Sequence, residues 1–339
     1  MTIATPIFLV VGIVALVIGA EGLVRGAARL AARTGMSSVV IGLTVVAFGT
    51  SAPELAVSIG DVLRGGDEAG AIAVGNVVGS NIANILLVLG IAATVGGSLL
   101  VAQRIVRLDV PIMIGASVLV WLFVLNEALG RLEGIVLTVM LVVYITWTVV
   151  KARGTSDDVS TEYDEALAPE KLRESSVWAD ILFVAVGLGF LVLGSQSLVS
   201  AASDIAGELG VSDLVIGLTV VAVGTSLPEI ATSVLAAMRG QRDLAVGNAI
   251  GSNLFNLLAV LGITAAVAPN PLPVAESAVR VDFPVMIAVA IACLPVFAHG
   301  YVLNRWEGIV FVLMYAGHRA VLVAECVLRR IEHEPHDVA

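Results

Sequence analysis

The sequence has little charge. Asp, Glu, Lys and Arg make up 14% of its 339 residues, whereas 58% are hydrophobic and the mean hydropathy is +1.00. Soluble globular chains carry about 25% charged residues, so this chain has too little polar surface to be a soluble enzyme of two ordinary domains. Basic residues are also in the minority, at 18 against 28 acids. That balance excludes a nucleic-acid partner, which needs a basic surface.

Cysteine is scarce as well. The two cysteines, Cys293 and Cys326, lie in apolar stretches without C-x-x-C spacing, which excludes a disulfide framework. The N-terminus lacks a basic segment and a small-residue cleavage site, so its first apolar run is predicted to be a retained helix rather than a signal peptide. Glycine, by contrast, is abundant at 34 residues. It lies among Ala, Val and Leu, a composition that suits closely packed membrane helices.

Apolar segments of membrane-spanning length recur along the whole chain. A helix needs roughly 20 apolar residues to cross a bilayer. Ten segments qualify, at about 5–31, 37–64, 70–96, 109–126, 130–151, 177–203, 212–238, 243–268, 281–299 and 305–328. A hydrophilic stretch with seven acids and two bases separates five spans from five. The expected organisation is a first five-helix repeat in 1–153, an acidic linker in 154–175 and a second five-helix repeat in 176–339.

The two halves repeat one another in sequence. Residues 39–54 read VVIGLTVVAFGTSAPE, and residues 214–229 read LVIGLTVVAVGTSLPE. Residues 73–90 read AVGNVVGSNIANILLVLG, and residues 245–262 read AVGNAIGSNLFNLLAVLG. Copies with an odd number of spans must insert in opposite orientations. The predicted fold is therefore an all-α membrane protein of ten transmembrane helices in two inverted five-helix repeats. Interrupted helices at matching places are typical of secondary transporters, whose site lies near the midplane.

The positive charges predict an orientation. If the N-terminus is outside, twelve Lys and Arg residues fall on the side of the linker and six on the other. Because cytoplasmic loops carry an excess of Lys and Arg, we expect a multi-pass protein of the cell membrane with both termini outside and a cytoplasmic linker.

Two acids lie where charge is most costly. Glu54 and Glu229 fall in the middle of apolar spans at equivalent places in the two halves. A charge at the centre of a membrane helix costs about 2.5–3.5 kcal/mol on insertion scales, so a duplicated pair indicates a functional site. A third acid, Glu21, lies deep in the first span and is expected to pair with Arg25, four residues further on.

Other polar residues share a helix face with these acids. Thr50 and Ser51 precede Glu54 by four and three residues, and Thr225 and Ser226 repeat this spacing before Glu229. Pro53 removes a backbone donor and clashes with the preceding turn, so carbonyls near 46–50 are expected to be free of regular helix bonds. Asn, Ser and Asn recur at four-residue spacing in each half: Asn76, Ser80 and Asn84, then Asn248, Ser252 and Asn256. For Asn76, Asn81, Asn248 and Asn253, hydrogen bonding between helices is an equally good interpretation.

These groups form an all-oxygen ligand set. Hard cations prefer oxygen, and Ca²⁺ accepts irregular cages of many ligands. No His or Cys occurs in the motifs, which argues against zinc or copper. Two carboxylates neutralise one Ca²⁺, and Na⁺ can use the same oxygens in smaller sites. Competition for shared ligands is then a physical basis for exchange.

The motifs G-T-S-x-P-E and G-N-x-x-G-S-N-x-x-N, each present twice, resemble the α-repeats of the cation/Ca²⁺ antiporter superfamily, and most of all its prokaryotic Na⁺/Ca²⁺ exchanger family. The resemblance implies a site formed by the second, third, seventh and eighth helices. By position, the implied metal ligands are Thr50, Ser51, Glu54, Ser80, Asn84, Thr225, Ser226, Glu229, Ser252 and Asn256, with backbone carbonyls from Ala47 and Ala222. It also implies that the first and sixth helices slide, which Gly12, Gly19, Gly22, Gly187, Gly189 and Gly194 would permit.

The expected function is a secondary active antiporter that exchanges Na⁺ for Ca²⁺ by alternating access. Its partners are the transported ions Ca²⁺ and Na⁺ and the lipid bilayer; no cofactor and no protein partner are required. A Ca²⁺/H⁺ exchanger and a K⁺-dependent Na⁺/Ca²⁺ exchanger are alternatives of the same class, and a Ca²⁺ channel is an alternative of another class. An enzyme is not expected, since neither a nucleophile–base pair nor a His cluster is visible.

Overall fold

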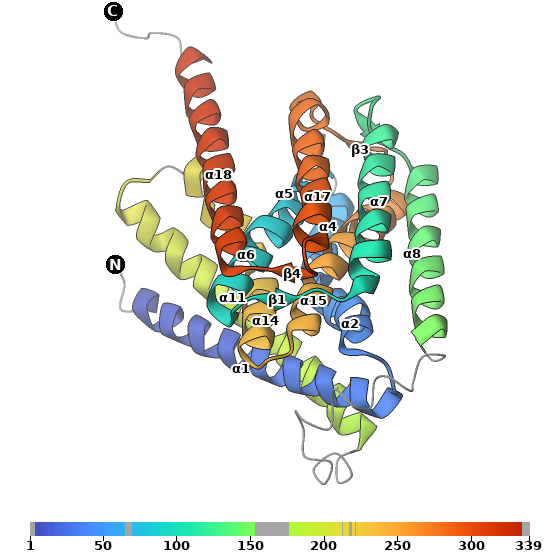
Figure 1. Ribbon diagram of the computed structural model, residues 1–339. Coiled ribbons are helices and arrows are strands. Elements are labelled where there is room, and N and C mark those ends of the chain that lie inside the picture. The colour runs from blue at the N-terminus through green and yellow to red at the C-terminus, as the bar shows by residue number, and fades with distance from the viewer. Residues whose placement is uncertain are drawn as a thin grey trace, which may run out of the picture.

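Long helices make up most of the protein (Figure 1). The computed structural model describes residues 4–64, 70–152, 176–211, 213–216, 219–220 and 222–333. Within that part of the chain, nine helices are long and apolar enough to cross a membrane. The seventh predicted span consists of shorter helices, of which the last is the apolar helix Leu227–Met238. The prediction of an all-α membrane protein is confirmed, whereas the linker predicted at 154–175 lies outside the described residues.

The first repeat contains five spans, three of which include a π-helical turn. The first is α1 (Ala4–Thr34), and the fifth is α8 (Arg131–Ala152). The second consists of α2 (Ser38–Ile41), a π-helical turn (Gly42–Val46), α3 (Ala47–Thr50) and α4 (Ala52–Arg64). The third consists of α5 (Ala71–Ala83), a π-helical turn (Asn84–Leu89) and α6 (Gly90–Gly96). The fourth begins with a π-helical turn (Ile105–Asp109) and continues as α7 (Val110–Phe123).

The second repeat has the same order of elements. It begins with α11 (Val177–Glu208), and its interrupted span consists of α12 (Asp213–Ile216), α13 (Ala222–Thr225) and α14 (Leu227–Met238). The next span consists of α15 (Arg242–Phe255), a π-helical turn (Asn256–Val260) and α16 (Leu261–Val267). The last two are a π-helical turn (Ala278–Asp282) with α17 (Phe283–Ala298), and then α18 (Arg305–His333).

Two short strand pairs display the two-fold relation between the halves. Strand β1 (Leu99–Leu100) pairs antiparallel with β4 (Val302–Leu303), and β2 (Ala128–Leu129) pairs antiparallel with β3 (Leu272–Pro273). In register, Leu99 faces Leu303 and Leu129 faces Leu272. Exchanging the two halves therefore turns one strand pair into the other. This reciprocal pairing is what an inverted repeat produces, so the predicted fold class is confirmed.

In three pairs of helices that join the two halves, a Cβ on a glycine of one helix would meet the carbonyl oxygen of a glycine on the other. A Cβ placed on Gly19 of α1 would lie 2.7 Å from the carbonyl oxygen of Gly187 in α11. The other two pairs repeat this pattern: Gly90 meets Gly308 between α6 and α18, and Gly134 meets Gly262 between α8 and α16. Because lipid provides no hydrophobic driving force between helices, such close packing contributes much of the free energy of their association.

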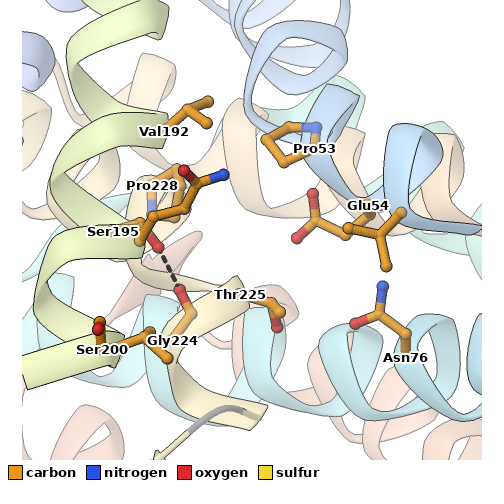
Figure 2. A pocket seen from close by; sticks show the side chains of 12 residues that line it. Pro53, Glu54, Asn76, Val192, Ser195, Ser200, Gly224, Thr225 and Pro228 are labelled. Atoms are coloured by element: carbon orange, nitrogen blue, oxygen red, sulfur yellow. Dashed lines mark hydrogen bonds between the residues drawn. The ribbon is translucent and has the colours of Figure 1, made fainter. Parts of the chain in front are cut away.

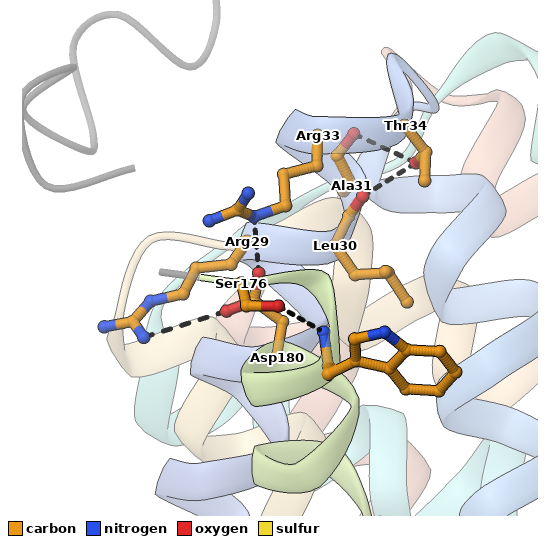
Figure 3. Close-up of polar contacts among 8 residues, drawn as sticks. Arg29, Leu30, Ala31, Arg33, Thr34, Ser176 and Asp180 are labelled. Carbon is orange, nitrogen blue, oxygen red and sulfur yellow. Dashed lines mark hydrogen bonds and ion pairs between the residues drawn. The ribbon is translucent and has the colours of Figure 1, made fainter. Parts of the chain in front are cut away.

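Helices α1 and α11 form the most extensive of these pairs and run obliquely across the upright α7, α8 and α17 (Figure 1). Gly12 packs on Gly194 and Gly19 on Gly187 along the pair. At its far end the buried Asp180 of α11 lies between two arginines of α1 (Figure 3). Arg33 Nε is 2.5 Å and Arg29 Nη1 is 3.8 Å from the carboxylate oxygens. These contacts join α1 and α11 into one unit.

The third and eighth spans form the centre of the protein. In both, 83% of the most apolar window is buried, more than in any other of the nine spans. They pack against the interrupted second and seventh spans. Because the chain crosses the membrane an even number of times, both termini share a side, here called the terminal side. The opposite side, where the fifth span ends and the sixth begins, is called the linker side.

Candidate cation site

Two matching helix breaks place Glu54 and Glu229. Helix α3 ends before Ser51, whose φ and ψ are −87° and 0°, and α4 starts directly after it. The second half repeats this break at Ser226, with φ −88° and ψ 3°. A proline follows each break in the first helical turn, where its missing N–H costs nothing. Glu54 and Glu229 therefore lie in the first turns of α4 and α14, where the helix dipole favours negative charge.

The backbone at the breaks differs in part from the expectation. The carbonyl of Ala47 accepts a hydrogen bond from Ser51 N at 3.0 Å, and Thr50 Oγ1 lies 3.4 Å from it, so the break does not free it. In the second half, Ser226 N donates to the Val223 carbonyl at 3.1 Å, three residues back. The N–H groups that Pro53 and Pro228 lack would have donated to the carbonyls of Gly49 and Gly224, four residues back. The Gly224 carbonyl accepts from Ser195 Oγ at 2.6 Å. Ala222 lies at the start of α13.

The amide and hydroxyl groups come from the third and eighth spans. Asn84 and Asn256 are each the first residue of a π-helical turn, a feature that occurs often at functional sites. Ser80 and Ser252 lie one turn earlier, and all four side chains are at most 4% exposed. The change from α- to π-helix falls at equivalent residues in the two halves.

Hydrogen bonds cross between the repeats at this centre. Thr50 Oγ1 donates to Asn248 Oδ1 at 3.2 Å and lies 3.3 Å from Ser252 Oγ. The Asn248 amide in turn donates to Ser233 Oγ at 3.0 Å. These contacts bring the break of the second span against the eighth span.

Asn81 and Asn253 hold the two central helices together. Each donates its amide to the backbone carbonyl of the other, at 3.4 and 3.2 Å. This reciprocal pair supports the helix–helix interpretation of the two residues. Asn81 Oδ1 also accepts from Asn256 Nδ2 at 3.1 Å. Asn256 therefore has its amide nitrogen occupied and its oxygen available.

Buried polar atoms without a protein partner gather around the two carboxylates. Glu54 and Glu229 are 2% and 1% exposed. Within the described part of the chain, the following buried atoms have no hydrogen-bond partner: Ser51 Oγ, Glu54 Oε2, Ser80 Oγ, both amide atoms of Asn84, Ser226 Oγ, Glu229 Oε2 and Asn256 Oδ1. Unsatisfied buried polar groups are rare in native proteins. So many in one place indicate a site that is completed by a charged ligand.

The sequence did not single out three further hydroxyl residues. Ser58 and Ser233 lie four residues after Glu54 and Glu229, and Thr232 lies beside Ser233; all three are 0% exposed. The hydroxyls of Ser58 and Thr232 have no hydrogen-bond partner among the described residues. The repeated four-residue spacing from each Glu was the signal that would have found the two serines.

A pocket of about 290 Å³ leads to Glu54. Figure 2 shows the Glu54 carboxylate of α4 pointing into the space between α4 and α11, with Thr225 and Asn76 nearby. Ser195 and Ser200 of α11 lie on the opposite wall. The path is lined largely by uncharged side chains, and Glu54 is the only ionisable residue among those that line it.

The predicted ligands thus come together in one region, from the four helices that the resemblance implied. Thr50, Ser51, Glu54, Ser80, Asn84, Ser226, Glu229, Ser252 and Asn256 are buried there, and Thr225 is half-buried. No group of three His, Cys, Asp or Glu side chains that could hold a metal ion occurs in the residues that the structure describes. The arrangement is suited to a hard cation held by two carboxylates and neutral oxygens.

Comparison with known proteins identifies the family. Residues 4–150 and 179–323 match the model of the sodium/calcium exchanger protein family. The chain is 38% identical to CaxA of Alkalimonas amylolytica, with 95% of this chain and 99% of CaxA covered. It is 34% identical to the sodium/calcium exchanger MaX1 of Methanosarcina acetivorans, with 86% and 90% covered. The solved structure of the sodium-calcium exchanger NCX_Mj without Na⁺ and Ca²⁺ superposes with a TM-score of 0.79 at 29% identity, covering 94% of this chain and 99% of that chain. The chain belongs to the sodium/calcium exchanger family.

Proposed function

We propose that this protein exchanges Na⁺ for Ca²⁺ across the membrane by alternating access around Glu54 and Glu229. Membership of the family makes it a cation/Ca²⁺ antiporter and not an enzyme. The single observation that carries the proposal is the gathering of unpartnered buried oxygen atoms around the two carboxylates, at paired helix breaks. MaX1 and NCX_Mj, both named as exchangers of sodium and calcium, support the choice of ions.

The ligand chemistry explains why the two ions would exchange. Ca²⁺ takes six to eight oxygen ligands in flexible geometry, and the proposed set offers two carboxylates, hydroxyls of Thr50, Ser51, Ser80, Thr225, Ser226 and Ser252, and amides of Asn84 and Asn256. The proposed set also includes the carbonyls of Ala47 and Ala222; the Ala47 carbonyl already accepts from Ser51 N and would offer the cation its second lone pair. Na⁺ would use the same oxygens, so occupation by one ion excludes the other. Exchange follows if the site faces one side of the membrane at a time.

The proposal is tested by ion flux into proteoliposomes. With Na⁺ loaded inside and none outside, Ca²⁺ uptake is expected at constant pH, and it should stop when the Na⁺ gradient is collapsed. Uptake driven by a pH gradient without Na⁺ would instead identify a Ca²⁺/H⁺ exchanger. Uptake that needs K⁺ together with Na⁺ would identify the K⁺-dependent exchanger, and Ca²⁺ flux without any counter-ion would identify a channel.

We further propose that the terminal side faces outward and the linker 154–175 lies in the cytoplasm, between repeats bounded at 1–153 and 176–339. The bias of Lys and Arg supports this orientation. The inner membrane protein YrbG of Escherichia coli is 35% identical over 258 residues, which supports a place in the cell membrane.

Reporter fusions test the orientation. Alkaline phosphatase fused to the C-terminus is expected to be active in an Escherichia coli host, because the terminal side would face the periplasm. Green fluorescent protein at the same position is expected to be dark. The same two reporters inserted in 154–175 should behave in the opposite way. A fluorescent C-terminal fusion would reverse the proposed orientation.

A further inference from the structure

The pocket at Glu54 opens toward the terminal side. Its walls include Val57 of α4, Asn76 of α5 and Ser200 in the second half of α11. Helix α4 ends, α5 begins and α11 ends on the terminal side. The structure therefore represents a state that is open to that side.

At the equivalent place on the linker side an ion pair joins α1 to the end of α14. Arg239, which caps the end of α14, donates through Nη2 to both carboxylate oxygens of Glu21 in α1, each at 2.7 Å. Glu21 also pairs with Arg25, its expected partner on the same helix. Because α14 carries Glu229 in its first turn, the pair with Arg239 joins α1 to a helix of the cation site.

The inverted repeat supplies the counterpart of this pair. Aligning residues 19–34 with 194–209 places Glu21 at Gln196 and Arg25 at Ser200, and Arg239 corresponds to Arg64 at the end of α4. Gln196 and Ser200 line the open pocket. If the halves exchange conformations to open the linker side, Gln196 approaches Arg64 where Glu21 now meets Arg239. The terminal side would then close without a carboxylate.

We propose that the Glu21–Arg239 pair is a latch that holds the linker side closed and thereby favours the state open to the terminal side. This inference rests on the proposed alternating access, and it assigns Glu21 and Arg239 as positioning residues of the cycle. The unit formed by α1 and α11 carries Glu21, so its movement relative to α14 must break the pair. Glu21 is 22% and Arg239 52% exposed. An ion pair of such exposure shifts the ratio of the two states by about two- to fivefold.

Cysteine labelling in nanodiscs measures that ratio without any transport. Val24, which is 2% exposed and corresponds to Val199 of the open pocket, should become accessible only when the linker side opens. The native Cys293 is 0% exposed, and Cys326→Ala completes the background. With a Val24→Cys probe in ion-free buffer, Glu21→Gln and Arg239→Gln are each expected to raise the maleimide labelling rate about two- to fivefold. The mirror probe Val199→Cys should label no faster in these variants.

Arg25→Gln is the matched control. It also removes one cation from Glu21, but the ion pair of Arg25 lies within α1 and does not join α1 to α14. The labelling rate should therefore stay unchanged. Reversing the pair, with Glu21→Arg and Arg239→Glu together, should return the rate to the parent value. Gln196→Glu should raise it, because it supplies the missing carboxylate for Arg64.

The latch is refuted if Glu21→Gln and Arg239→Gln label at the parent rate, or if Arg25→Gln labels as fast as they do. Failure of the proposed function would look different. In that case the parent protein shows no Na⁺-driven Ca²⁺ uptake, whatever the labelling rates. Normal uptake together with unchanged labelling would overturn the latch alone.

Discussion

Glu54→Gln and Glu229→Gln are each expected to reduce Na⁺-driven Ca²⁺ uptake nearly to background. A unit charge at about 4 Å contributes roughly 4 kcal/mol at an effective dielectric of 20, and Ca²⁺ carries two. Removing one carboxylate should therefore weaken Ca²⁺ binding by at least about a hundredfold, since each 1.4 kcal/mol is tenfold. Uptake into proteoliposomes at fixed Ca²⁺ measures the loss. Full activity in either variant would remove that carboxylate from the mechanism.

Melting curves separate this effect from misfolding. One carboxylate oxygen of each Glu has no protein partner, so the ion-free Gln variants should melt near the parent temperature. They should lose the stabilisation that Ca²⁺ gives the parent, which is about 2.7 kcal/mol at a hundred times Kd. The contrasting control is Asp180→Asn, another fully buried carboxylate. It removes the carboxylate that Arg29 and Arg33 contact, so it should lower the melting temperature while keeping the Ca²⁺-induced shift.

The candidate site could be located from the sequence because its main signal is positional. A charge in an apolar span is costly wherever it lies, and its duplication at Glu54 and Glu229 needs no knowledge of the fold. The repeat predicted the inverted halves for the same reason: span number and order are read along the chain. The hydroxyls and amides followed from helical spacing relative to the two acids.

The contacts between distant segments had no such signal. Thr50 meets Asn248 across 198 residues, and Glu21 meets Arg239 across 218; no periodicity of the sequence pairs them. The π-helical turns that begin at Asn84 and Asn256 contain neither Gly nor Pro, so no residue type within them marks the change of helix. The Ala47 carbonyl was expected to be free because the effect of Pro53 was assigned to the whole turn. The structure limits that effect, since Ser51 N still reaches Ala47.

The glycines of α1 and α11 were associated with sliding, and the structure gives most of them a second role. Gly12, Gly19, Gly187 and Gly194 hold the two helices in backbone contact, whereas Gly189 meets nothing within 4 Å. A Cβ on Gly187 would lie 2.6 Å from Leu23 N and 2.8 Å from the Gly19 carbonyl oxygen. Neither of these backbone atoms can move away unless α1 separates from α11. Gly187→Ala is therefore expected to destabilise the protein by about 1–3 kcal/mol.

Gly189→Ala is the matched control, two residues away on the same helix. Its side chain enters open space, and alanine is the better helix former by about 0.5–1 kcal/mol, so its melting temperature should equal or exceed that of the parent. For Gly187→Ala, a fall of roughly 5 °C is expected. Loss of most Na⁺-driven Ca²⁺ uptake is expected as well, because α1 and α11 would no longer move as one unit. Equal melting temperatures and equal uptake in the two variants would show that α1 and α11 need no backbone contact to move as one unit.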